Sequence, residues 1–126
     1  MNALGFAAVG VGAAIGAWLR WMLNVTMNAW LPLLPLGTLA ANLIGGYCVG
    51  IAVAVFESSA TVAPEWRLFV ITGLLGGLTT FSTFSAESVQ LLGAGRAGWA
   101  LLHSGLHLAG SILMCYLGMQ TVAVLR

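Results

Sequence analysis

Residues 76–85 read GGLTTFSTFS, a polar run with paired glycines inside a segment that is otherwise apolar enough for a membrane. In hydrocarbon, interrupted helices and clustered hydroxyl groups are tolerated only where protein buries them or where they line a watery path. The run therefore predicts an ion pathway. The rest of the chain indicates which kind of protein surrounds it.

The composition is that of an integral membrane protein. Hydrophobic residues make up 60% of the 126 residues and charged residues 6%, and neither Lys nor Asp occurs. Four segments reach the roughly 20 residues that a membrane-spanning helix needs, and they lie near residues 4–29, 36–57, 66–93 and 97–124. We predict one all-α, four-helix transmembrane domain over residues 1–126. No basic segment typical of a signal peptide precedes the first span, so we expect that span to be retained.

The arginines are balanced between the two sides of the predicted bundle. Arg67 and Arg126 fall on one side, and Arg20 and Arg96 fall on the other. The bias of Lys and Arg between short loops sets orientation in a membrane, and here it gives no preference. We expect insertion in both orientations and pairing as an antiparallel, dual-topology homodimer. The alternative is that so few charges leave the topology undetermined.

Pairs of glycines four residues apart predict close helix packing, because small residues let two helix backbones approach. These pairs are Gly12–Gly16, Gly46–Gly50 and Gly73–Gly77. The pattern does not identify which helices meet.

The third segment has length to spare for an interruption. A helix of 27 residues is roughly 40 Å long, whereas the hydrocarbon layer is about 30 Å thick. We predict a break near residues 76–80, close to the membrane midplane, where glycines and threonines favour unwinding. Of the two half-helices, the end with free carbonyls attracts cations and the end with free N–H groups attracts anions.

Two phenylalanines follow the predicted break. Phe81 and Phe84 are three residues apart and so share one helix face. The edge of an aromatic ring is positive, so two ring edges can stabilise a small anion without a fixed charge. Ser82, Thr83 and Ser85 add hydroxyl donors that can replace lost water. The competing interpretation is ordinary core packing, and the surrounding hydroxyls favour the anion site.

With four spans, near-balanced loop charge, an Asn in the second segment and GGLTTFSTFS in the third, the sequence closely resembles the Fluc (CrcB-type) family of small bacterial fluoride channels. The resemblance covers essentially the whole chain. It implies a multi-pass protein of the bacterial inner membrane that exports fluoride passively. It also implies an antiparallel homodimer with two fluoride pores and a structural sodium ion, Na+, at the dimer centre. The expected partners are fluoride, a second copy of the chain and the lipid bilayer, without nucleic acid.

The resemblance also implies roles for particular residues. Phe81 and Phe84 resemble the aromatic box of the pore, Asn42 resembles the pore amide, and Ser82 and Thr83 resemble a polar track for the ion. An unpaired amide inside a membrane is costly, so Asn42 needs either a permeant ion or, as the alternative, an interhelical hydrogen bond.

Further assignments follow from the same resemblance. The backbone carbonyls of Gly76 and Thr79, from both subunits, resemble the sodium ligands. Ser111 resembles a pore-facing serine.

The fourth segment carries His103, His107 and Ser111 at intervals of four residues, hence on one face. We predict that His107 lines the pore, where a neutral histidine can donate to an anion. Packing as a hydrogen-bonded membrane histidine is the alternative for both rings. The His-x-x-x-His spacing also suits a metal, but no third ligand is near in sequence, so we expect no zinc site.

Two charged residues lie inside or close to the spans. Arg20, beside Trp21, is predicted to anchor at the interface. The resemblance implies instead that it lies near an aqueous vestibule, where its charge attracts anions. Glu87 is predicted to face a vestibule or to cap the polar track, because a membrane carboxylate needs water or donors. Proton coupling is the alternative role for Glu87.

Two rival functions are considered. A small multidrug exporter also has four helices, but it needs a carboxylate in the first span, and none is present there. A holin-like or accessory subunit needs no ordered run of hydroxyls and aromatics. We predict that the protein is not an enzyme, because no nucleophile, base and acid fall into a recognisable pattern.

Overall fold

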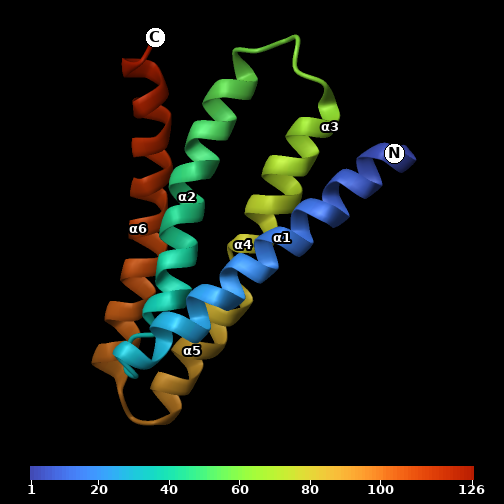
Figure 1. The fold of residues 1–126 in the computed structure, drawn as a ribbon. Coiled ribbons are helices and arrows are strands. Elements are labelled where there is room, and N and C mark those ends of the chain that lie inside the picture. The colour runs from blue at the N-terminus through green and yellow to red at the C-terminus, as the bar shows by residue number, and fades with distance from the viewer.

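The structure, a computed structural model, describes residues 1–126 and consists of helices and the turns that join them. In chain order the elements are α1 (Ala3–Met27), η1 (Asn28–Trp30), α2 (Leu36–Glu57), α3 (Pro64–Arg67), η2 (Leu68–Leu75), α4 (Gly76–Leu78), α5 (Ser82–Gly93) and α6 (Ala97–Val124). They form four helical stretches long and apolar enough to cross a membrane, namely Ala3–Trp30, Leu36–Glu57, Pro64–Gly93 and Ala97–Val124. The predicted all-α architecture with four spans is confirmed (Figure 1).

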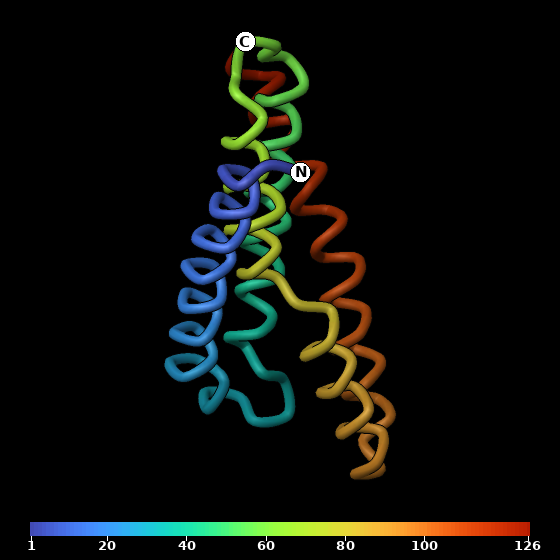
Figure 2. Tube along the Cα trace, turned by 90° about the vertical axis from the view of Figure 1, so that its right-hand side faces the viewer, coloured from blue at the N-terminus to red at the C-terminus, as the bar shows by residue number.

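The four stretches pack in two groups. α2 lies along α6, while α1 packs obliquely against η2 and α4 (Figure 1). The third stretch changes partner along its length, since η2 and α4 contact α1 whereas α5 contacts α6. Figure 2 shows the chain passing from one group to the other between α4 and α5. The polar run in residues 76–85 therefore lies where the two groups meet.

The crossing of α1 with η2 and α4 depends on glycine. A Cβ placed on Gly16 would lie 2.0 Å from the carbonyl oxygen of Leu74, and one on Gly77 would lie 2.5 Å from that of Ala13. Such distances leave no room for any side chain. The predicted close approach at these glycines is confirmed, and the partners lie within one chain.

The contact between α2 and α6 also depends on glycines. A Cβ on Gly50 would lie 2.0 Å from the carbonyl oxygen of Cys115, and one on Gly118 would lie 2.2 Å from that of Tyr47. The two helices therefore meet backbone to backbone, which fixes the height of α6 relative to α2. This register determines which α6 side chains reach the polar run.

Side chains and one glycine define where the helices end. The Asn28 side-chain oxygen accepts hydrogen bonds from the backbone N–H groups of Gly37 and Thr38, at 2.8 and 3.1 Å, which satisfies the start of α2. After α5, Gly95 has a φ of 73°, a conformation that glycine adopts without a steric penalty. This turn reverses the chain so that α6 returns alongside α5.

Only 22 of the 126 residues are buried, and large apolar side chains such as Phe6, Trp18 and Leu101 are exposed. For a chain with four spans, an apolar outer face suits contact with lipid. By contrast, the buried polar side chains Thr38, Asn42, Thr80, His103 and His107 lie inside the bundle. They identify the region where a site is expected.

Candidate ion site

The helical run of the third stretch stops at Thr79. The carbonyl oxygen of Leu75 accepts both the backbone N–H of Thr79, at 3.0 Å, and the hydroxyl of Thr79, at 2.8 Å. Thr79 then turns to an extended conformation, with ψ of 156°, and α5 begins at Ser82. The three residues 79–81 are non-helical. The expectation that Gly76 and Gly77 themselves unwind is wrong, because both are helical in α4 and Gly77 packs against α1.

Asn42 of α2 holds the non-helical residues in place. Its side-chain oxygen accepts the backbone N–H of Thr80 at 2.7 Å, and its amide nitrogen donates to the carbonyl of Thr80 at 2.9 Å. Asn42 thus pairs with Thr80 as a neighbouring strand would, which satisfies two buried backbone groups. The same nitrogen lies 2.9 Å from His107 Nδ1. The alternative of an interhelical hydrogen bond for Asn42 is therefore realised in this structure.

Backbone carbonyls are free on the α4 side of the interruption. Those of Gly76 and Thr79 accept no hydrogen bond within the chain, because Thr80 N–H goes to Asn42 and Thr83 N–H goes to the Thr80 hydroxyl at 3.1 Å. Between them, the carbonyl of Gly77 accepts a hydrogen bond from Arg20 Nε at 3.1 Å. The predicted anchor Arg20 is thus half-buried and caps one of the freed carbonyls.

The aromatic pair lies on the other side of the interruption. The rings of Phe81 and Phe84 are 5.3 Å apart and meet edge to face, at 70°. Phe81 precedes the first turn of α5 and is 75% exposed. Phe84 is half-buried and stacks on His103 and His107, with ring centroids 5.3 and 4.7 Å away. The stacking on the two histidines thus holds the Phe84 ring of the pair in place.

A cavity of about 270 Å³ connects these groups. Asn42, Phe81, Phe84, His107 and Ser111, five of the predicted pore residues, line it together with Thr79 and Thr80. No charged side chain lines the cavity. An ion inside would therefore meet aromatic rings, hydroxyls and an amide rather than a fixed charge.

The predicted polar track lies beside this cavity rather than in its wall. The Ser82 hydroxyl is 3.4 Å from that of Thr80, and Ser82 is exposed. Thr83 is half-buried one residue further along α5. The Ser85 hydroxyl donates to the carbonyl of Phe81 at 2.8 Å, so it serves the start of α5.

The family model described as "CrcB-like protein, Camphor Resistance (CrcB)" matches residues 7–119. The chain belongs to the CrcB family. Proteins named fluoride-specific ion channel FluC are similar to it over nearly the full length. The protein from Cupriavidus necator is 62% identical over 125 residues, covering 99% of both chains. That from Cupriavidus metallidurans is 57% identical over the same coverage, and that from Pseudomonas putida is 57% identical over 90% of both chains.

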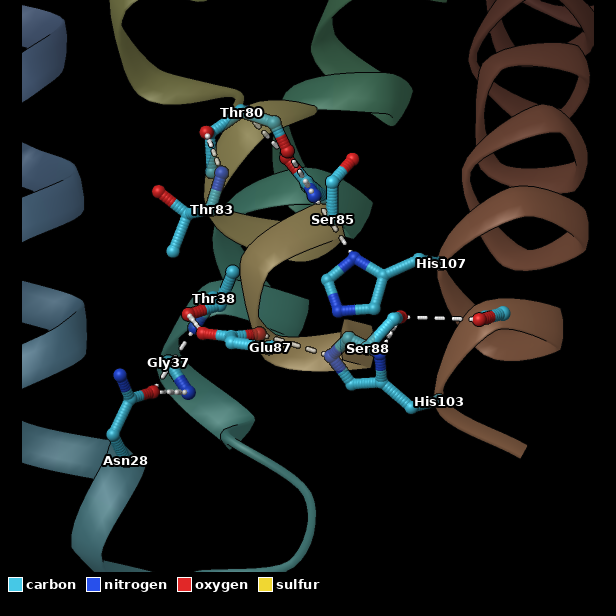
Figure 3. A network of polar contacts seen from close by, with 12 residues as sticks. Asn28, Gly37, Thr38, Thr80, Thr83, Ser85, Glu87, Ser88, His103 and His107 are labelled. Atoms are coloured by element: carbon cyan, nitrogen blue, oxygen red, sulfur yellow. Dashed lines mark hydrogen bonds and ion pairs between the residues drawn. The ribbon is translucent and has the colours of Figure 1, made fainter. Parts of the chain in front are cut away.

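A buried polar network in this CrcB-family chain was not predicted from the sequence. The Glu87 carboxylate accepts from the Thr38 hydroxyl at 2.6 Å and lies 2.9 Å from His103 Nε2 (Figure 3). On its other side, His103 Nδ1 lies 2.8 Å from the Ser88 hydroxyl, which lies 3.1 Å from that of Ser104. The network connects α2, α5 and α6. Both carboxylate oxygens have partners, so Glu87 needs no vestibule water to be satisfied.

The expectation that no third metal ligand lies near the histidines is wrong. Glu87, His103 and His107 present ligand atoms within 4.8 Å of one another. However, the Asn42 amide nitrogen can only donate, so His107 Nδ1 accepts and the ring hydrogen is on Nε2. An ionised Glu87 likewise requires a hydrogen on His103 Nε2. Neither nitrogen that faces Glu87 then offers a lone pair, and the geometry gives no support to a zinc site.

Proposed function

We propose that this chain forms a passive, fluoride-selective ion channel in the bacterial inner membrane. The observation that supports it most is the uncharged cavity where the Phe81 and Phe84 rings meet the side chains of Asn42 and Ser111. The CrcB relatives named fluoride-specific ion channels support the choice of fluoride.

The cavity suits a small anion for a physical reason. Positive ring edges and a hydroxyl donor stabilise a dehydrated anion, while the lack of a fixed charge in the wall lets it leave again. Ser111 lines the cavity, and no hydrogen bond within the chain engages its hydroxyl, which we expect to donate to the anion. We expect selectivity against the larger chloride to come from a dehydrating path whose donors suit the smaller ion.

Passive conduction is sufficient for resistance to fluoride. Fluoride enters acid environments as neutral HF, which dissociates in the cytoplasm and leaves the anion trapped. A channel then returns the anion down its electrochemical gradient without energy coupling. Both oxygens of Glu87, the carboxylate within the spans, are engaged in hydrogen bonds, which suits a structural role better than proton exchange.

The proposed assembly is an antiparallel, dual-topology homodimer with two pores. The balanced arginines support insertion in both orientations. We place the interruption at residues 79–81 near the membrane midplane, where two inverted copies would bring their third stretches together.

The residues at the interruption fit a structural sodium ion at the centre of that dimer. The carbonyls of Gly76 and Thr79 are free of hydrogen bonds, Gly76 is exposed and Thr79 is half-buried. Two chains would supply four oxygen ligands, which a hard cation prefers. Bound there, sodium would neutralise carbonyl ends of the broken helices.

The test is fluoride efflux from liposomes that contain the purified protein, read with a fluoride electrode. A potassium ionophore provides charge balance, and chloride efflux is measured in parallel. We expect rapid fluoride release with little chloride release. Release that requires a proton gradient would favour a coupled transporter, and the absence of release would remove the proposed function.

A further inference from the structure

The Asn42 amide, predicted as a donor to the permeating anion, has no hydrogen to spare in this structure. Its nitrogen carries two hydrogens, and the two acceptors at 2.9 Å are the carbonyl of Thr80 and Nδ1 of His107. Its oxygen accepts from Thr80 N–H. Although Asn42 lines the cavity, an anion there must displace an existing partner to reach the amide.

Of the two acceptors, His107 is the one that can change. The pairing with Thr80 fixes the orientation of the Asn42 amide, because exchanging its oxygen and nitrogen would place like groups together. The nitrogen therefore faces His107, and Nδ1 must accept. In the neutral ring the hydrogen is on Nε2, so a further proton can bind only at Nδ1.

Protonation would place two donors face to face at the present 2.9 Å, and the hydrogen bond between them would be lost. We infer that His107 is a positioning residue that withholds the Asn42 N–H from the anion when neutral and releases it when protonated. The released N–H and the new Nδ1–H then both point to the space between them, at the wall of the cavity. An anion accepts from both at once. The inference rests on the proposed channel function.

Groups on three helices face His107. From α5, the Glu87 carboxylate lies within 4.8 Å of the histidine nitrogens, and the Phe84 ring stacks at 4.7 Å. From α6, His103 is the other titratable neighbour, with ring centroids 4.5 Å apart, and it is paired with Glu87. From α2, only the uncharged Asn42 amide faces the ring. Glu87 and the Phe84 face attract an imidazolium, while a protonated His103 opposes it.

The buried Nε2–H of His107 has no hydrogen-bond partner. Figure 3 shows His107 above the pair of Glu87 and His103. A charged ring would interact with this carboxylate more strongly than a neutral one. The unpaired Nε2–H of His107 thus lies in the same cluster as this carboxylate.

The experiment compares fluoride flux at symmetric pH values from about pH 8 down to about pH 4, a range that extends below the usual range of histidine titration. Flux through protein-free vesicles is subtracted to remove HF leakage. We expect wild-type flux at limiting fluoride to rise about tenfold as the pH falls, since one added charged hydrogen bond corresponds to about that factor in affinity.

Two variants separate the roles of the ring atoms. His107→Asn keeps an oxygen acceptor near the position of Nδ1 but cannot be protonated, so we expect low flux without acid activation. His107→Leu has no acceptor, so the Asn42 N–H stays free, and we expect flux at neutral pH to exceed that of the wild type, again without pH dependence. His103→Gln should retain the acid response.

A second readout does not depend on any variant. In 15N NMR of histidine-labelled wild-type protein, His107 should carry its hydrogen on Nε2 near neutral pH, and fluoride should shift the midpoint of its titration to higher pH. A hydrogen on Nδ1 at neutral pH, a flat wild-type flux profile, or an acid response that survives in His107→Asn would overturn the inference alone. Absence of fluoride flux at every pH would instead remove the proposed function and this inference with it.

Discussion

Two helix contacts in this molecule are built in opposite ways. Where α1 crosses η2 and α4, the backbones touch at Gly16 and Gly77, and shape alone sets the geometry. Where α5 meets α6, buried polar side chains meet, and hydrogen bonds through Glu87 and His103 set it. The first contact tolerates no added atom, and the second tolerates no lost partner. Glycine contacts thus set how α1 crosses the third stretch, whereas hydrogen bonds set how the polar side chains of α5 and α6 are placed.

The largest expected effect is at the glycine contact. Gly16→Ala would place a methyl group 2.0 Å from the Leu74 carbonyl oxygen, so the helices must separate. We expect a loss of about 3 kcal/mol in the free energy of unfolding, the upper end of overpacking effects, measured by denaturation in detergent. Gly10→Ala is the matched control, because nothing lies within 4 Å of its added Cβ. Equal stability of the two variants would show that the helix crossing does not require glycine at position 16.

The next effect is at the polar contact. Glu87→Ala removes the acceptor of His103 and leaves the Thr38 hydroxyl with only the more distant Asn24 oxygen, at 3.4 Å. We expect a cost of about 2 kcal/mol of unfolding free energy. Glu57→Ala, at an exposed acid, should change stability little. If Glu87→Ala is as stable as Glu57→Ala, the network does not hold α5 to α6.

A smaller effect, but one specific for function, is expected from Phe84→Ile. The substitution keeps an apolar side chain but removes the ring edge. Fluoride flux should therefore fall at least about tenfold, which corresponds to the free energy of one aromatic interaction. The variant should still elute from size-exclusion chromatography as a folded protein. Phe81→Ile should act in the same direction. Ile112→Leu, also in the cavity wall, is the control and should conduct normally. Unchanged flux in both phenylalanine variants would remove the aromatic-edge mechanism.

The smallest effect tests a hydrogen bond outside both contacts. Tyr47 on α2 and Thr121 on α6 join their hydroxyls at 2.9 Å in a half-buried position. Tyr47→Phe should lower the free energy of unfolding by about 0.5–1 kcal/mol without changing fluoride flux. A change in flux would show that this part of the α2–α6 contact influences the cavity.

The sequence predicted the features that depend on local composition. Hydropathy located all four spans, with Leu36–Glu57 and Ala97–Val124 at the predicted bounds, and glycine spacing indicated close crossings. It placed the interruption slightly too early, because tertiary packing keeps Gly77 helical against α1. The helix propensity of a short segment does not contain information about a contact with a residue that is far away in the chain.

The candidate site was predicted only in part, because some of its contacts join residues that are far apart in the sequence. The structure places five of the predicted residues around one cavity, namely Phe81, Phe84, Asn42, His107 and Ser111, and their role in a fluoride pore stays a prediction. The partners of Glu87 were missed, because Thr38 and His103 lie 49 and 16 residues away in the chain and nothing local connects them. The one available signal was the charge of Glu87 itself, which required buried partners somewhere in the bundle.

The length of α6 has a consequence for the surrounding lipid. Its 28 residues make a rod of about 42 Å, which exceeds a hydrocarbon layer of about 30 Å. A rod of that length fits only if it leans or if the bilayer thickens around it. Since Gly50 and Gly118 lock α6 against α2, the two helices must lean as a unit. Bilayer thickness therefore sets the tilt of the α2–α6 pair. Because both helices contribute residues to the cavity wall, we expect the shape of the cavity to depend on the thickness of the membrane.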